Sequence, residues 1–213
     1  MVIAFRPECC NPGSNRHLYR VSLHGDIFSV TITATVAVAR RWLYLTRHLN
    51  RAILSRGALV VGLGVQWTNS TDGNPVADTV NLCVGDRCLI FQISRAGSVP
   101  LSLRRFLVDP RCTFVGFWNR HDRNMLLASR HTLDMANDPL DLRMILNNRE
   151  LADSDVETIV EACLGYRGVR LVREVNISDW SVGTLHYNQV LQASLEAHCA
   201  FLIGCQFQAW EYR

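Results

Sequence analysis

The sequence predicts an α/β domain in which helices flank a mixed β-sheet. Alternating, β-branched residues run from 18 to 33, and a continuous apolar segment from 58 to 67 has the pattern of a fully buried strand. From residue 99 onward, helical and strand patterns alternate. Sheet segments followed by such alternation are typical of a sheet that combines parallel and antiparallel neighbours.

Length and composition bound the domain organisation. The chain has 213 residues, of which 48% are hydrophobic and 19% charged, which excludes disordered, collagen-like and low-complexity classes. We expect a flexible leader over 1–15, which holds Pro, Gly and Asn, and a single domain over 16–213. No apolar run reaches the roughly 18 residues of a membrane span, so we expect no membrane partner. The leader lacks the apolar stretch of a secretory signal, which predicts a cytoplasmic or nuclear location, or both.

The first part of the predicted domain is a hairpin and a helix within 18–52. His24-Gly25-Asp26 interrupts the alternating pattern and predicts the hairpin turn. Apolar residues at helical spacing, Ala39 and Leu43 among them, predict a helix over 36–49.

The second part, 58–205, is the predicted core. Residues 58–67 form its central strand, and a polar loop follows over 69–75. The remaining segments predict, in order, a hairpin of strands over 77–83 and 87–94, a helix over 99–107, a strand over 113–118, a helix over 121–130, a short strand or loop over 133–141, short helices over 153–163 and 168–175, and a long final helix over 185–205.

The basic residues are all arginines. Residues 1–56 carry a net charge of +6 and residues 57–213 a net charge of −3. A solvated helix face is the favoured interpretation of the arginines after residue 36, and a phosphate-facing surface is the second. The overall charge of +3 does not by itself require nucleic acid. The uneven distribution would suit head-to-tail contacts between copies of the chain.

The eight cysteines form no CxxC pair and no zinc-ligand spacing. Cys83 and Cys88 flank a predicted hairpin turn, so they can lie opposite each other on two strands. Since no secretory signal is present, we expect reduced, buried thiols.

Three strings in the core carry a family resemblance. They are Val60–Trp67, Phe114–Arg123, and the segment from Ser178-Asp179-Trp180 through Gln189–His198. In this order and at these separations they resemble the three motifs of the 3′–5′ exonuclease domain of the Werner syndrome helicase and of ribonuclease D, and the chain is similar to stand-alone plant members. These domains belong to the Asp-Glu-Asp-Asp (DEDD) superfamily. The resemblance implies a ribonuclease H-like mixed sheet of the exonuclease type.

The family resemblance also implies a chemistry, two-metal phosphodiester hydrolysis on four carboxylates. Here the first motif has Gly64 and Gln66 where the family has Asp and Glu. The second motif keeps its acid as Asp122. The third has Glu196 in place of Asp, and Gln192 in place of the tyrosine that orients the attacking water.

These substitutions lower the formal ligand charge from −4 to −2. Two neighbouring dications need dense negative charge, so we expect that the two-metal site does not assemble and that no cofactor is required. Mg²⁺ or Mn²⁺ would be needed only for residual activity. A single weakly held ion on Asp122 and Glu196 is one prediction for these acids. A hydrogen-bonded pair, or a salt bridge to an arginine, is the favoured one.

The predicted function is a 3′–5′ exonuclease-like protein that has lost hydrolysis and acts as a nucleic-acid-binding or protein-assembly module. Trp67, Trp118, Arg120 and Arg123 are the candidate contacts to a single strand. Trp118 stands where the family usually has Gly, and Trp180 is expected in the core. The alternatives are an active or weakly active Mg²⁺- or Mn²⁺-dependent exonuclease on single-stranded or recessed DNA or RNA, and a purely protein-binding role. Family resemblance adds homo-oligomerisation as an expected property.

Two histidines near the motifs are candidates to replace the lost groups. His121 precedes Asp122, and His198 follows Glu196 by two positions. Residues two apart on a helix do not face each other, so we expect His198 to point away from the carboxylate. Both histidines are interpreted as structural.

Overall fold

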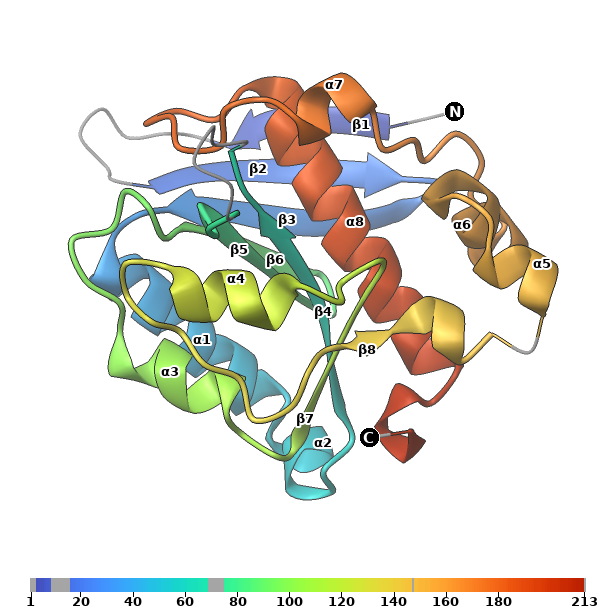
Figure 1. The fold of residues 1–213 in the computed structure, drawn as a ribbon, viewed down its shortest axis with the longest axis horizontal. Coiled ribbons are helices and arrows are strands. Elements are labelled where there is room, and N and C mark those ends of the chain that lie inside the picture. The colour runs from blue at the N-terminus through green and yellow to red at the C-terminus, as the bar shows by residue number, and fades with distance from the viewer. Residues whose placement is uncertain (1–2, 9–15, 69–74, 147, 213) are drawn as a thin grey trace.

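The computed structural model describes residues 3–8, 16–68, 75–146 and 148–212. Its described strands form one mixed sheet (Figure 1). In spatial order they are β1 (Ile3–Glu8), β2 (Arg16–Leu23), β3 (Asp26–Thr33), β6 (Arg87–Gln92), β5 (Thr79–Val84), β4 (Leu59–Gln66), β7 (Cys112–Gly116) and β8 (Leu140–Asp141). The pairs β3–β6, β4–β7 and β7–β8 are parallel and the other pairs are antiparallel, which confirms the predicted mixed sheet.

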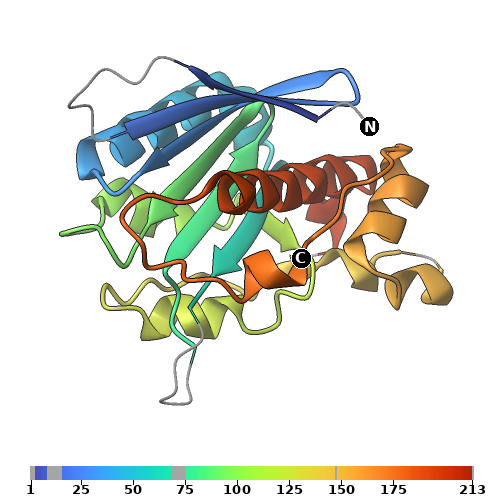
Figure 2. The same ribbon diagram turned by 90° about the horizontal axis from the view of Figure 1, so that it is seen from above.

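Helices cover the sheet and connect its strands. They are α1 (Val36–Leu49), α2 (Arg51–Ser55), α3 (Leu101–Leu107), α4 (Asp122–Ala128), α5 (Arg149–Ala152), α6 (Val156–Leu164), α7 (Arg173–Asn176) and α8 (Tyr187–Gln206). Figure 1 shows α8 lying across the strands, and Figure 2 shows the same helix from above. No helix in the described part of the chain combines the length and the hydropathy that a bilayer span requires.

Two hydrophobic cores lie on opposite faces of the central strand β4. Val60 packs with apolar residues of α8 and α6 in one core. Val61 and Leu63, which point the other way because side chains alternate along a strand, pack with residues of α1 and α3 in the other. Every residue of β4 is buried. This explains why the strand reads as a continuous apolar run rather than an alternating one.

Close contact between α8 and β4 fixes the position of the helix. A Cβ atom at Gly62 would lie 1.9 Å from the backbone oxygen of Ala197, so only glycine fits there. At Gly204, a Cβ atom would lie 2.9 Å from side-chain carbons of Val60 and Val115. The two glycines bring the helix backbone against the sheet. Glu196 is thereby held above the carboxyl end of β4.

Most predicted elements are confirmed. The hairpin of 18–33 is β2 and β3, and its turn residues His24 and Gly25 both have positive φ, at 50° and 100°, as a tight two-residue turn requires. The helix over 36–49 coincides with α1. The hairpin over 77–94 is β5 and β6, and the final helix is α8.

Two predictions about local structure are wrong. The leader over 1–15 contains the strand β1, whose backbone pairs antiparallel with β2 from Ile3 to Glu8. Main-chain hydrogen bonds to an edge strand do not depend on side-chain patterning, so composition misled the prediction. The predicted helix over 168–175 is helical only from Arg173, and the residues before it form a loop that is bonded to α8 through Val172 and Gln192. Most of the predicted loop over 69–75 lies outside the described residues.

Candidate functional site

A cleft opens where the parallel strands β4 and β7 both end. The carboxyl ends of adjacent parallel strands, where chain connections diverge, are the usual ligand sites of open α/β sheets. The cleft has a volume of about 360 Å³. Its lining comes from β4, the turn after β7, the start of α4, the α7 region and α8, and consists of Val65, Gln66, Trp67, Phe117, Trp118, Asp122, Leu171, Asn176, Ile177 and Glu196.

Glu196 occupies the α8 side of the cleft and is tied to the central strand. The Nε2 of Gln66 donates a hydrogen bond of 2.8 Å to Glu196 Oε2. Burial raises the pKa of Glu196 to about 7, while the Gln66 hydrogen bond acts in the opposite direction. The carboxyl group therefore keeps its proton to a higher pH than an exposed glutamate does.

Gly64 lies two residues before Gln66 on β4, so a side chain at position 64 would point to the same face of the strand as Gln66. A Cβ atom at this position would lie 3.7 Å from Glu196 Oε2 and 3.4 Å from the Nδ2 of Asn81. These are ordinary van der Waals distances. The buried Asn81 Nδ2 has no hydrogen-bond partner within the described residues. A polar side chain at position 64 would thus fit the space and would meet both an acid and an unused donor.

Asp122 begins α4 and is buried on the floor of the cleft. Burial raises its pKa well above the ordinary value, and the charges of Glu196 and Asp141 raise it further. Neither Asp122 nor Glu196 forms an ion pair with an arginine among the residues that the structure describes. Glu196 instead accepts its hydrogen bond from Gln66, a partner that was not predicted for these acids.

Trp118 forms one wall of the cleft and is 45% exposed. Its φ is +48°, a left-handed conformation that residues with a Cβ atom seldom adopt. The guanidinium carbon of Arg143 lies 4.6 Å from the centre of the indole ring, and the same guanidinium forms a 2.6 Å ion pair with Asp141. The indole ring of Trp118 is therefore stabilised in its partly exposed position by a cation–π contact with Arg143.

Trp67 and Trp180, the other tryptophans of the three motifs, lie in different surroundings. Trp67 is partly buried and lines the cleft beside Gln66. Trp180 is fully buried in the core, where its Nε1 donates a 3.2 Å hydrogen bond to the backbone oxygen of Asn176.

Gln192 does not line the cleft. Its Oε1 accepts a 2.6 Å hydrogen bond from the backbone nitrogen of Val172, and its Nε2 donates to Oδ1 of Asn176. Asn176 itself lines the cleft. Gln192 thus positions the α7 wall of the cleft instead of reaching into it.

The two predicted arginines lie outside the cleft lining. Arg120 is exposed. Arg123 forms ion pairs of 3.1 Å with Asp134 and 3.5 Å with Asp138. The guanidinium of Arg123 is already partnered, whereas Arg120 projects from the loop that carries Trp118.

The histidines also lie outside the cleft lining. His121 is the exposed residue immediately before α4. His198 points away from Glu196, as predicted, and its Nδ1 lies 3.5 Å from Cys83 Sγ. Neither histidine replaces a missing acid in the cleft.

Sequence reasoning missed the α7 wall of the cleft. Leu171, Asn176 and Ile177 carry no motif, and only the fold brings them opposite Trp118. The ion pair of Asp141 with Arg143 could have been predicted from the sequence, because residues two apart at the end of a strand can form a local ion pair.

Comparison with known proteins identifies the fold. No protein-family model and no curated protein matches this chain. Among solved structures, the Escherichia coli exoribonuclease RNase D, involved in structured RNA processing, matches 78% of this chain and 43% of its own at 15% identity, with a TM-score of 0.60. The Nibbler EXO domain of Aedes aegypti matches 76% of this chain and 84% of its own at 17% identity, with a TM-score of 0.57. NrnC of Brucella melitensis bound to pGG matches 72% of this chain and 74% of its own at 15% identity, with a TM-score of 0.56.

The chain therefore has the fold of the DEDD-type 3′–5′ exonuclease domains, a ribonuclease H-like mixed sheet flanked by helices. It spans less than half the length of the RNase D chain. At these identities the likeness establishes the fold, and the chemistry has to be argued from the side chains in the cleft.

Proposed function

We propose that this protein is a 3′–5′ exonuclease-like module that binds single-stranded nucleic acid in the cleft and does not carry out two-metal hydrolysis. The observation that carries the proposal is the hydrogen bond from Gln66 to Glu196 beside the glycine at position 64. The family motif has two acids at these positions of β4. Here Gly64 has no side chain, and Gln66 provides an amide that donates a hydrogen bond.

The donor set does not fit two Mg²⁺ or Mn²⁺ ions. These hard cations take oxygen ligands, and two of them in proximity need several carboxylates to offset their repulsion. Matching the motif positions leaves Asp122 and Glu196 as the acids, and the pKa values of both are raised by burial. The Gln66 amide nitrogen already occupies one oxygen of Glu196. We therefore derive no hydrolytic step through metal ions.

The rim of the cleft supports binding of a single strand. Trp118 is exposed and contacts Arg143, and Trp67, the residue after β4, lines the same cleft. Exposed or partly exposed aromatic rings stack with unpaired bases of any sequence. Ile177 adds a 55% exposed apolar surface on the α7 wall. The binding of pGG by the fold neighbour NrnC is consistent with this use of the cleft.

Cleft charge also favours this proposal. A fully ionised acid cluster would repel phosphate, but the raised pKa values of Asp122 and Glu196 reduce that repulsion near neutral pH. Arg120, exposed two residues after Trp118, is positioned to contact a backbone phosphate. We further propose a cytoplasmic or nuclear location and a homo-oligomeric state for this protein.

The proposal is tested with the full chain and 5′-labelled single-stranded DNA and RNA. Fluorescence anisotropy at two salt concentrations should show binding that weakens as salt rises, because phosphate contacts release counterions. Incubation with Mn²⁺ should leave the oligonucleotides at full length on a denaturing gel. Shortening that is lost in Asp122→Ala would establish the active-exonuclease alternative. Background-level binding at both salt concentrations would favour protein assembly instead.

A further inference from the structure

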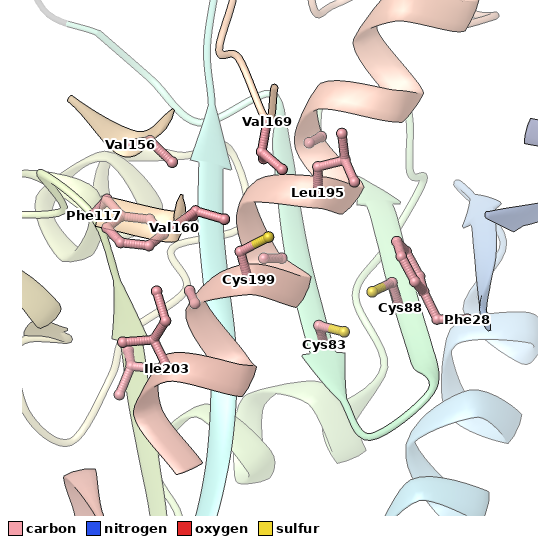
Figure 3. Close-up of a cluster of buried hydrophobic side chains, with 14 of the residues drawn as sticks. Phe28, Cys83, Cys88, Phe117, Val156, Val160, Val169, Leu195, Cys199 and Ile203 are labelled. Carbon is pink, nitrogen blue, oxygen red and sulfur yellow. The ribbon is translucent and has the colours of Figure 1, made fainter. Parts of the chain in front are cut away.

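A second cluster of potential ligands lies outside the cleft lining, between α8 and the hairpin of β5 and β6. It consists of Cys83 on β5, Cys88 on β6 and His198 on α8, and we name it the Cys-Cys-His cluster. One ligand atom from each of the three residues lies within 4.8 Å of the other two, and all three side chains are buried. Figure 3 shows Cys83 and Cys88 on neighbouring strands beneath α8.

Local structure explains why the three residues meet. Cys83 and Cys88 are direct partners in the antiparallel register of β5 and β6, so their side chains share one face of the sheet. The turn between the strands contains Gly85 at a φ of 62°. Glu196 faces the cleft, so His198, two residues further along α8, faces the hairpin.

The imidazole of His198 is poorly partnered for a buried group. Its Nδ1 lies 3.5 Å from Cys83 Sγ, and its Nε2 has no hydrogen-bond partner in the described part of the chain. The ring stacks on Phe28 at a centroid distance of 4.0 Å, which fixes its orientation. Besides the contact between Cys83 and His198, the sulfur atoms make long contacts to backbone oxygens, 3.9 Å from Cys83 to Gly85 and 4.0 Å from Cys88 to Ser194. In either tautomer, one ring nitrogen faces a weak sulfur partner and the other faces none.

We propose that the Cys-Cys-His cluster is a binding site for a thiophilic d¹⁰ cation, Zn²⁺ or Cu⁺. Thiolate and imidazole ligands select these soft or borderline ions over Mg²⁺ and Mn²⁺. Zn–S and Zn–N bonds in a tetrahedral site place sulfur and nitrogen about 3.5 Å apart. This equals the separation of Cys83 Sγ and His198 Nδ1.

Charge balance is compatible with burial. On binding Zn²⁺, each of the two thiols loses its proton to water as its sulfur–metal bond forms, and on binding Cu⁺ only one of them does. Two thiolates, a neutral imidazole and Zn²⁺ sum to zero, which suits the apolar core around the cluster. Cu⁺ with one thiolate, one thiol and the imidazole is likewise neutral. Cys88 lies two residues after the exposed turn residue Asp86.

Metal binding to the full chain tests the proposal. All proteins carry Cys9→Ser and Cys10→Ser, which prevents those two thiols from contributing. Co²⁺, as a spectroscopic substitute for Zn²⁺, should bind with one equivalent and a sulfur-to-metal charge-transfer band. An anaerobic titration with Cu⁺ against a competing chelator distinguishes the two ions. We expect Cys88→Ser and His198→Gln to weaken binding at least tenfold, and the matched control Cys112→Ser, a buried cysteine on β7, to leave it unchanged.

A second measurement uses the protein with the cluster intact, so its result does not depend on whether the cluster variants fold. X-ray absorption of the protein loaded with Zn²⁺ should show two sulfur ligands and at least one imidazole nitrogen. A shell of oxygen and nitrogen alone, no retained metal, or equal loss of binding in Cys112→Ser would overturn the proposal. So would recovery of the purified protein with Cys83 and Cys88 joined as a disulfide that persists when metal is supplied with a reductant.

Discussion

Gln66 and Glu196, 130 residues apart in the sequence, are joined by a 2.8 Å hydrogen bond in which the amide donates to the carboxylate across the cleft. The bond connects the end of the central strand to the long final helix. It occupies the oxygen of Glu196 that is nearest the Cβ position of Gly64. The cleft therefore contains an internally satisfied polar contact where a metal-binding exonuclease would need free carboxylate oxygens.

Glu196→Gln should change the pH dependence of stability. The carboxyl pKa is raised from its ordinary value of 4.5 to about 7, so between these pH values the folded protein holds a proton that the unfolded chain has released. The free energy of unfolding of the wild type should then fall by about 2–3 kcal/mol from pH 5 to pH 8. The variant keeps a carbonyl acceptor for Gln66 and should not show this decrease. Urea unfolding across the pH range measures the difference, and superimposable pH profiles would contradict the assignment.

Gly62 and Gly64 should respond oppositely to alanine. At Gly62 the new Cβ would lie 1.9 Å from the backbone oxygen of Ala197, so Gly62→Ala should destabilise the protein by about 3 kcal/mol or more. At Gly64 the nearest contacts are ordinary, and Gly64→Ala should be neutral or stabilising by about 0.5–1 kcal/mol, since glycine is unfavourable within a strand. Chemical denaturation of the pair tests whether position 64 accommodates a side chain. Equal destabilisation would refute that geometry.

Asp109→Asn should destabilise the protein at neutral pH. A hydrogen bond from Arg111 is the main reason why the pKa of the buried Asp109 is lowered to about 2, with a smaller contribution from Arg47 of α1. This stabilisation is fully present above the ordinary carboxyl pKa of 3.8 and is lost as pH falls through 2. We expect a loss of about 2 kcal/mol at pH 7, which shrinks toward pH 2. A deficit in thermal unfolding that is independent of pH would show that packing, and not charge, is responsible.

Trp118→Gly should separate stability from binding. Glycine adopts the left-handed φ of +48° freely, which relieves about 1–2 kcal/mol of strain, and loss of the contact with Arg143 costs about 0.5–1 kcal/mol. Stability should therefore change by no more than about 1 kcal/mol. Affinity for a single-stranded oligonucleotide should fall about tenfold, because a stacking surface is removed.

Tyr44→Ala is the control for this variant. Tyr44 is 66% exposed on α1 and does not line the cleft. Anisotropy titrations should show wild-type affinity for this protein. An equal loss of affinity in both variants would mean that the strand binds without using the cleft.

Much of the fold could be predicted from the sequence because its elements carry strong local patterns. The buried run of β4, the turn of β2 and β3 and the helical spacing of α1 each specify one structure. The strand β1 could not be predicted, because its pairing with β2 depends on an available sheet edge and not on its own residues. The loop before α7 likewise depends on a distant partner, because the backbone nitrogen of Val172 donates a hydrogen bond to Gln192 on α8.

The candidate site was predictable only in part. The motif spacing identified Gln66, Asp122 and Glu196, and the structure brings them to one cleft. The protonation of Asp122 and Glu196 and the direction of the Gln66 amide depend on burial, which a sequence does not specify. Gln192 lies outside the cleft lining because its side chain is hydrogen-bonded to Val172 and Asn176. These two residues precede the third motif in the sequence.

The number of Mn²⁺ ions bound by the oligonucleotide complex tests the central claim most directly. Electron paramagnetic resonance of free Mn²⁺ during titration counts the bound ions, and the hard ion does not compete for the Cys-Cys-His cluster. We predict that no pair of ions binds and that a single weak ion on Asp122 and Glu196 is the upper limit. Two ions bound per chain, lost in Asp122→Ala and accompanied by shortening of the oligonucleotide, would contradict the account.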